Sequence, residues 1–98
     1  MSGGARRRLV MRRQLEIKNA LGLHARAATL WVQTARRFDA DLVVSKDGKD
    51  VNGKSIIELM MLAAARGSRI EVTASGPDAA AMLDAIEQLT EQKFHEEQ

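Results

Sequence analysis

The chain has 98 residues and a net charge of +2, a length that fits one small domain. It contains no cysteine and no apolar run of membrane-spanning length, so neither disulfides, nor a thiolate metal site, nor a membrane span is predicted. Five arginines lie in the first thirteen residues, so the remaining chain is acidic, and with one Trp, two Phe and no Tyr it is poorly suited to nucleic acid.

The first predicted elements are a strand and an amphipathic helix joined by a loop. Leu15 and Ile17 alternate with charged neighbours, which predicts a half-buried strand over 13–18. A loop over 19–22 ends at Gly22. A helix is then predicted over 25–38, because apolar residues recur three or four positions apart at Ala28, Trp31, Ala35 and Phe38.

The second half of the chain predicts a hairpin, a short helix, a strand and a last helix. A strand over 40–46 and a short one over 49–51 flank the turn sequence Asp47-Gly48. Ser55 and Glu58 form a capping-box pattern before an apolar helix running through residue 62. A strand over 70–75 and an amphipathic helix from 79 to about 92 complete a two-layer α+β domain with an open sheet face. We expect this domain to cover 13–92, between a flexible basic tail over 1–12 and a polar tail over 93–98, where His95 would be solvated.

His24 stands where the first strand and loop give way to the first helix. The start of a helix offers unpaired N–H groups and the positive end of the helix dipole, which together suit a phosphate. A histidine there can carry a transferred phosphoryl group, and Arg26 lies two residues further on. Position alone favours the simpler interpretation, a surface histidine that happens to precede a helix.

A second pattern, from Gly48 to Ser55, matches the expression for a nucleotide-binding P-loop. We do not favour that interpretation, because Asp47-Gly48 predicts a hairpin turn and Val51 lies in the returning strand. In addition, no later apolar strand ends in an aspartate that would hold magnesium. Ser55 itself is predicted to be an N-cap, a position where a phosphate would also be stabilised, with Lys54 placed to help.

Taken together, these motifs resemble those of the HPr family, the histidine-containing phosphocarriers of the phosphoenolpyruvate-dependent phosphotransferase system. Gly22-Leu23-His24-Ala25-Arg26 is similar to the active-site signature of that family, and Lys54-Ser55-Ile56 to its regulatory serine motif. The resemblance covers roughly residues 13–92. It implies an open-faced β-sandwich of order βαββαβα, with a four-stranded antiparallel sheet covered on one face by three helices.

The resemblance also implies roles for individual residues and partners. His24 would accept a phosphoryl group on Nδ1 from Enzyme I and pass it to a downstream EIIA-type carrier, in a cytoplasmic relay rather than as a turnover enzyme. The Arg26 guanidinium and the Ala25 backbone N–H would stabilise the phosphate. Ser55 would be the target of an HPr serine kinase/phosphorylase, and partners would dock on Ile56, Ile57 and Met60. No cofactor, metal, membrane or nucleic acid is implied.

One residue departs from the family pattern. Ala27 occupies a position that usually holds proline, in the first turn of the helix. This departure leaves sugar uptake open as the role of the relay and makes a nitrogen-type or purely regulatory relay more plausible. The alternative hypothesis is a regulatory binding module of such a relay, controlled through Ser55.

Overall fold

Four antiparallel strands form the sheet, and the last of them lies inside it. The computed structural model describes residues 9–96, and all statements of structure refer to these residues. The strands are β1 (Val10–Glu16), β2 (Asp41–Lys46), β3 (Lys49–Asn52) and β4 (Arg69–Ser75), and their order across the sheet is β1-β4-β2-β3. In β4, the buried residues Ile70, Val72 and Ala74 alternate with partly exposed ones, as the sequence predicts for a sheet covered on one face.

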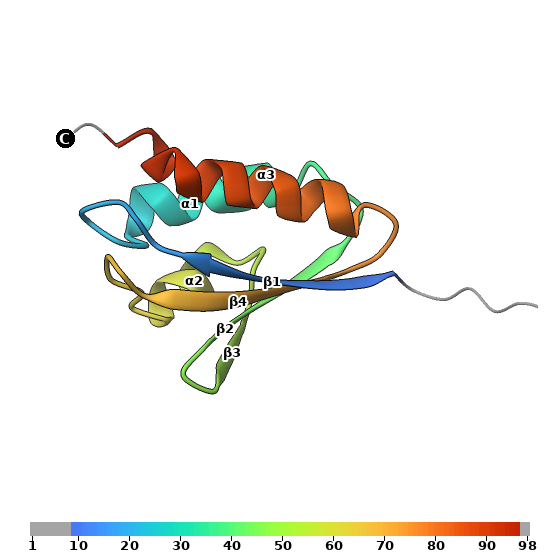
Figure 1. Cartoon of the computed structure of the whole chain (residues 1–98), viewed down its shortest axis with the longest axis horizontal. Coiled ribbons are helices and arrows are strands. Elements are labelled where there is room, and N and C mark those ends of the chain that lie inside the picture. Colours follow the sequence, from blue (N-terminus) through green and yellow to red (C-terminus); the bar gives the residue numbers. More distant parts are fainter. Residues whose placement is uncertain (1–8, 97–98) are drawn as a thin grey trace, which may run out of the picture.

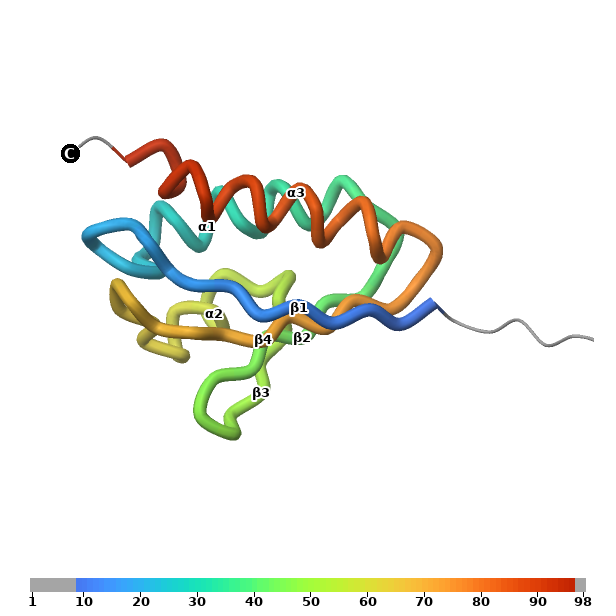
Figure 2. The backbone as a smooth tube through the Cα atoms, in the orientation of Figure 1, coloured from blue at the N-terminus to red at the C-terminus, as the bar shows by residue number. Residues whose placement is uncertain are grey.

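Helices pack against one face of this sheet (Figure 1). They are α1 (Ala25–Ala35), α2 (Ile56–Met61) and α3 (Ala79–Glu91), followed by a short 3₁₀ turn, η1 (Lys93–His95). Figures 1 and 2 show α1 and α3 lying side by side above the strands, and α2 contacts both α1 and β3. The predicted element order and the antiparallel α+β fold are therefore confirmed. No helix in residues 9–96 is long and apolar enough to cross a membrane.

The core lies between the sheet and the helices. Trp31 of α1 is fully buried there, and its ring stacks on that of Phe94 from η1, with the ring centroids 6.5 Å apart. On the side of the helix layer, Arg13 of β1 forms ion pairs of 2.8 and 2.9 Å with Asp84 and Glu87 of α3. These contacts fix the last helix, and with it the C-terminal segment, over the first strand.

The larger differences from the sequence prediction lie at the start of β1, the end of α1 and the end of the chain, and the other boundaries shift by one or two residues. β1 begins at Val10 rather than residue 13, because residues 10–12 pair with the far end of the long strand β4. Helix α1 ends at Ala35, and residues 36–38 form a turn rather than a last helical turn. The segment predicted as a polar tail from residue 93 instead forms η1, because Phe94 is 2 % exposed in the core.

The P-loop pattern is folded as a hairpin. Gly48 has a φ of +80° at the tip, and four of the following residues form β3, paired antiparallel with β2. A strand cannot also wrap around a phosphate, so the preference for a hairpin over a nucleotide-binding loop is confirmed.

Candidate functional site

The loop between β1 and α1 places His24 at the start of α1. Gly22 has a φ of +70°, a left-handed conformation that glycine adopts without strain. A Cβ at Gly22 would lie 2.5 Å from the carbonyl oxygen of Ala64, and the Leu23 N–H donates to that same oxygen at 2.9 Å. The loop is thus held against the segment that follows α2, and His24 follows directly.

His24 is the N-cap residue of α1, as its position in the sequence predicts. Its backbone is extended and its carbonyl accepts the first helical hydrogen bond, from the Ala28 N–H at 2.8 Å. Its side chain makes no capping hydrogen bond, so it does not occupy the N–H groups of the first turn. These groups belong to Ala25, Arg26 and Ala27, and they are available to an anion bound at the start of the helix.

A pocket of about 410 Å³ opens beside the imidazole. Its lining consists of Leu21, His24, Arg26, Ala27, Phe94, His95 and Glu96. Arg26 is exposed, and it sits at the positive end of the helix dipole, where a cation is unfavourable unless an anion lies nearby. The pocket therefore brings together a half-exposed histidine, an arginine and the free end of a helix, which is a chemistry suited to a phosphoryl group.

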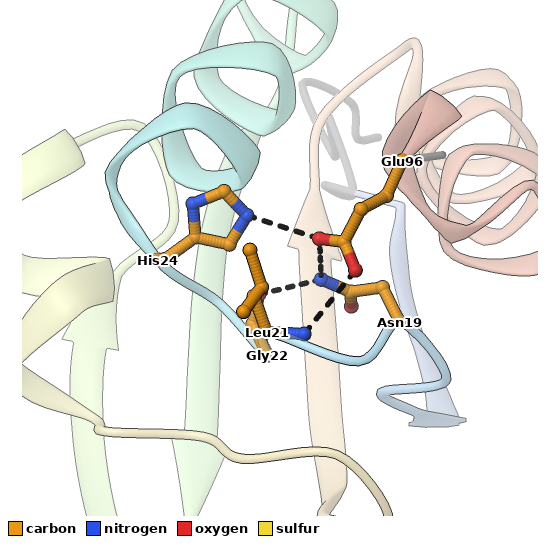
Figure 3. Close-up of polar contacts among 5 residues, drawn as sticks. All are labelled: Asn19, Leu21, Gly22, His24 and Glu96. Atoms are coloured by element: carbon orange, nitrogen blue, oxygen red, sulfur yellow. Dashed lines mark hydrogen bonds and ion pairs between the residues drawn. The ribbon is translucent and has the colours of Figure 1, made fainter. Parts of the chain in front are cut away.

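A carboxylate from the end of the chain contacts the imidazole (Figure 3). Glu96 Oε2 lies 3.2 Å from His24 Nε2 and accepts from the Asn19 side-chain amide at 3.0 Å. The second oxygen of the carboxylate accepts from the Leu21 N–H at 3.2 Å. Figure 3 shows the other ring nitrogen, Nδ1, pointing away from Glu96.

These contacts favour the ionised form of Glu96. The hydrogen bond from the Asn19 amide, followed by those from the Leu21 N–H and His24, lowers the pKa of Glu96 below its ordinary value, although partial burial acts in the opposite direction. The Glu96 side chain is only 13 % exposed, compared with 31 % for His24. The carboxylate is therefore the more enclosed partner and the imidazole the more accessible one.

Two residues of this site, Asn19 and Glu96, are not predicted from the sequence. Asn19 is fully buried, and its amide also donates to the Gly22 carbonyl at 2.7 Å. The sequence indicates only that this asparagine lies in a turn, where an asparagine side chain often forms hydrogen bonds with nearby backbone groups. Glu96 lies 72 residues from His24 in a stretch that appears polar, where the single apolar Phe94 is the only sign of docking. His95, expected to be solvated, is exposed but lines the pocket.

Ser55 lies at the opposite end of α2 from the Ala64 contact with the His24 loop. Its hydroxyl accepts from the Glu58 N–H at 3.2 Å, so the predicted N-cap forms. The Glu58 carboxylate instead accepts from the Asn52 N–H at 2.9 Å, and the reciprocal half of the capping box is replaced by this bond. Lys54, expected to help hold a phosphate, donates to the Phe38 carbonyl at 3.1 Å.

The predicted docking residues differ in exposure. Ile57 is 73 % and Met60 42 % exposed, whereas Ile56 is partly buried and packs against the core. Met61 and Leu21, which sequence reasoning did not single out, are 57 % and 69 % exposed. Exposed apolar side chains are thus present both on α2 and in the loop that carries His24. Within residues 9–96, no cluster of side chains is suited to hold a metal ion.

Comparison with known proteins places these features in context. The family model described as "PTS HPr component phosphorylation site" matches residues 11–92. The chain is 46 % identical to the phosphocarrier protein HPr of Treponema pallidum, covering 85 % of this chain and 94 % of the relative. It is 42 % identical to the phosphocarrier protein NPr of Shewanella violacea, over 88 % and 94 % of the two chains. A crystal structure of HPr from Thermoanaerobacter tengcongensis superposes with a TM-score of 0.86 at 43 % identity, covering 90 % of this chain and 99 % of that one.

Proposed function

The chain belongs to the HPr family of phosphocarriers of the phosphotransferase system, and on that premise we propose that His24 accepts a phosphoryl group from Enzyme I and passes it to an EIIA-type carrier. The observation that carries this proposal is the pocket that joins His24 to Arg26 and the uncapped first turn of α1. The protein acts as a covalent carrier in a relay, so it holds a phosphoryl group between two partners rather than turning over a substrate of its own.

The site meets the two requirements of such a carrier. The nucleophile must be accessible, and His24 is half-exposed with Nδ1 pointing away from Glu96 (Figure 3). The transferred charge must be balanced, and the N–H groups of Ala25 and Arg26 together with the Arg26 guanidinium supply fixed positive ends. The open pocket keeps the phosphoryl group within reach of a second protein, as reversible transfer requires.

Phosphorylation by Enzyme I and phosphoenolpyruvate tests the proposal. We expect an acid-labile, base-stable adduct that His24→Ala abolishes. His95→Ala is the matched control, because it removes the other histidine of the same pocket and leaves the labelled nitrogen in place. A wild-type protein that remains unlabelled, or a His24→Ala protein that is labelled as well as the wild type, contradicts the assignment.

Arg26 is proposed to stabilise the phosphoryl group rather than the fold. Its side chain is exposed, so Arg26→Ala should leave the thermal midpoint unchanged and slow transfer about tenfold, as expected for the loss of one charge-assisted contact. Arg36→Ala, at the other end of α1, is the control for loss of a surface arginine. Equal transfer rates in the wild type and Arg26→Ala would remove Arg26 from the mechanism.

The partners are proposed to dock on the apolar surface formed by Leu21, Ile57, Met60 and Met61, with Ile56 supporting it from below. Exposed apolar side chains beside a reactive group are the usual anchor of a transient interface. Ile57→Ser should therefore weaken binding to Enzyme I, while chemical phosphorylation of His24 by a small donor stays unchanged.

Ser55 is proposed as a regulatory phosphorylation site, and this supports a second candidate function, a binding module of a nitrogen-type relay. A phosphate at the N-cap would meet free N–H groups but would lie next to the Glu58 carboxylate, so the effect would fall on partner recognition. If this second function is correct, Ser55→Asp changes the affinity for a partner while His24→Ala does not. The phosphocarrier function predicts instead that His24→Ala abolishes transfer of the phosphoryl group.

A further inference from the structure

Glu96 offers an acceptor to the His24 ring on the side opposite the free nitrogen. We propose that Glu96 is a positioning residue that holds the imidazole proton on Nε2 and so leaves Nδ1 as the nitrogen that takes the phosphoryl group. This inference rests on the proposed phosphocarrier function and deepens it, by assigning the choice of nitrogen to a residue at the far end of the chain.

The tautomer follows from the chemistry of the two partners. An ionised carboxylate can only accept hydrogen bonds, so the hydrogen in the contact of 3.2 Å between Nε2 and Glu96 Oε2 must be carried by the ring. A neutral imidazole carries one N–H, so a proton on Nε2 leaves the lone pair on Nδ1. The carboxylate therefore selects the nucleophilic nitrogen without touching it.

The carboxylate is held in place independently of His24. Asn19 and the Leu21 N–H each donate to it, and Asn19 also donates to Gly22 at 2.7 Å, two residues before His24. Phe94, two residues before Glu96, is buried against Trp31. The acceptor and the loop that carries the imidazole are thus tied into one unit, and rotation of the ring would break its contact with Glu96.

This arrangement also fits the balance of the transfer step. The Nδ1 lone pair forms a new bond to phosphorus as the bond from phosphorus to the donor nitrogen breaks. The ring then bears a positive charge shared between its nitrogens while the proton stays on Nε2, facing Glu96. No proton has to leave or arrive, and the carboxylate stabilises the charged ring in the phosphorylated state.

Two substitutions at Glu96 separate the selection of the ring nitrogen from the stabilisation of the charged ring. Glu96→Ala removes the acceptor, whereas Glu96→Gln keeps an acceptor oxygen for Nε2–H and removes the charge. Glu91→Gln is the matched control, because Glu91 is a carboxylate near the end of α3 that pairs with Lys18 at 2.7 Å, outside the pocket. Backbone amide spectra report whether each variant keeps the fold.

The first readout is the ring ¹⁵N spectrum of His24 in the unphosphorylated protein, above the pH at which the ring is protonated. The wild type and Glu91→Gln should show a protonated Nε2 and an unprotonated Nδ1, and in Glu96→Ala the two nitrogen shifts should move towards each other. Nitrogen shifts in Glu96→Ala identical to those of the wild type would overturn the proposal, whether or not the protein is a phosphocarrier.

The second readout uses phosphoramidate, a small donor whose nitrogen leaves as ammonia, so that no partner protein is involved. The wild type should be modified on Nδ1 alone and Glu96→Ala on both nitrogens, while Glu96→Gln should keep the Nδ1 selectivity. Glu96→Gln should lower the equilibrium level of phosphorylation about three- to tenfold, as expected for a partly exposed charge pair. Wild-type modification on Nε2 would overturn the proposal. Selective Nδ1 modification combined with no transfer from Enzyme I would refute the proposed function alone.

Discussion

Phe94→Ala tests how the C-terminal segment is attached to the domain. Truncating a fully buried phenylalanine usually costs about 3–5 kcal/mol of stability. Here the residue lies in a turn in which Lys93, Phe94 and His95 all have φ between 54° and 57°. A left-handed conformation costs a non-glycine residue about 1–2 kcal/mol, so the turn stores about 3–6 kcal/mol that its release would recover.

The cost of losing Phe94 and the strain recovered are therefore of similar size. We expect segment 93–96 to detach in Phe94→Ala while the rest of the domain stays folded, so the free energy of unfolding should fall by less than about 2 kcal/mol. Trp31, the one tryptophan of the sequence, loses its stacked partner, and its fluorescence maximum should shift to longer wavelength. The His24 ring should lose its Glu96 contact in the same variant.

Urea unfolding, tryptophan emission and the His24 ring spectrum measure these three effects on one sample. Phe38→Ala, which truncates the other phenylalanine, is the control and should leave the ring spectrum of His24 unchanged. A fall of about 4 kcal/mol in the free energy of unfolding, with the contact between Glu96 and His24 intact, would refute the argument that release of backbone strain offsets the lost burial of Phe94.

The remaining predictions concern the loop and the first turn of α1. Gly22→Ala should lower stability by about 2–4 kcal/mol in urea unfolding, because it combines left-handed strain with a clash against the Ala64 carbonyl; a loss below about 1 kcal/mol would show that the loop yields. The pKa of Glu96 is lowered in the folded protein, so the ionised carboxylate adds to the free energy of unfolding above the pKa of the unfolded chain, and this stabilisation is lost as the pH falls through the pKa of the folded state. The difference in free energy of unfolding between the wild type and Glu96→Gln should therefore shrink on acidification. A difference that stays constant from pH 7 to pH 3 would contradict this. Ala27→Pro should raise the thermal stability slightly, by about 0.5 kcal/mol, because it restricts the unfolded chain, and it should leave phosphorylation intact because the proposed phosphate donors, the N–H groups of Ala25 and Arg26, are kept; a destabilised protein would show that this backbone does not accept proline.

The sequence predicts the framework of this site better than its chemistry. Alternation in β4 and the three-to-four spacing in α1 are local patterns, and both elements form where these patterns lie. The position of His24 at the helix start is likewise local, since Gly22 and the change of period are neighbours of it. Glu96 could not be placed from sequence, because its contact with His24 depends on how α3 crosses the sheet.

Boundaries were predicted less well for a related reason. Residues 10–12 look like part of a basic tail until the length of β4 provides partners for them. The sequence places Phe94 in a polar tail, because a single apolar residue among polar ones shows neither helical nor strand periodicity. In both cases the deciding information is the partner surface, which lies more than fifty positions away in the chain.

The strand order β1-β4-β2-β3 has a consequence for how the molecule forms. Among the strands of residues 9–96, the hairpin of β2 and β3 is the only pairing between strands adjacent in sequence, and the one partner of β1 is β4, which lies between it and β2. Closing such distant pairs costs chain entropy before the contacts repay it, which slows folding relative to a helical protein of similar length. The first strand can therefore pair only after the last one has formed, and we expect the loop that carries the histidine to become ordered late in folding.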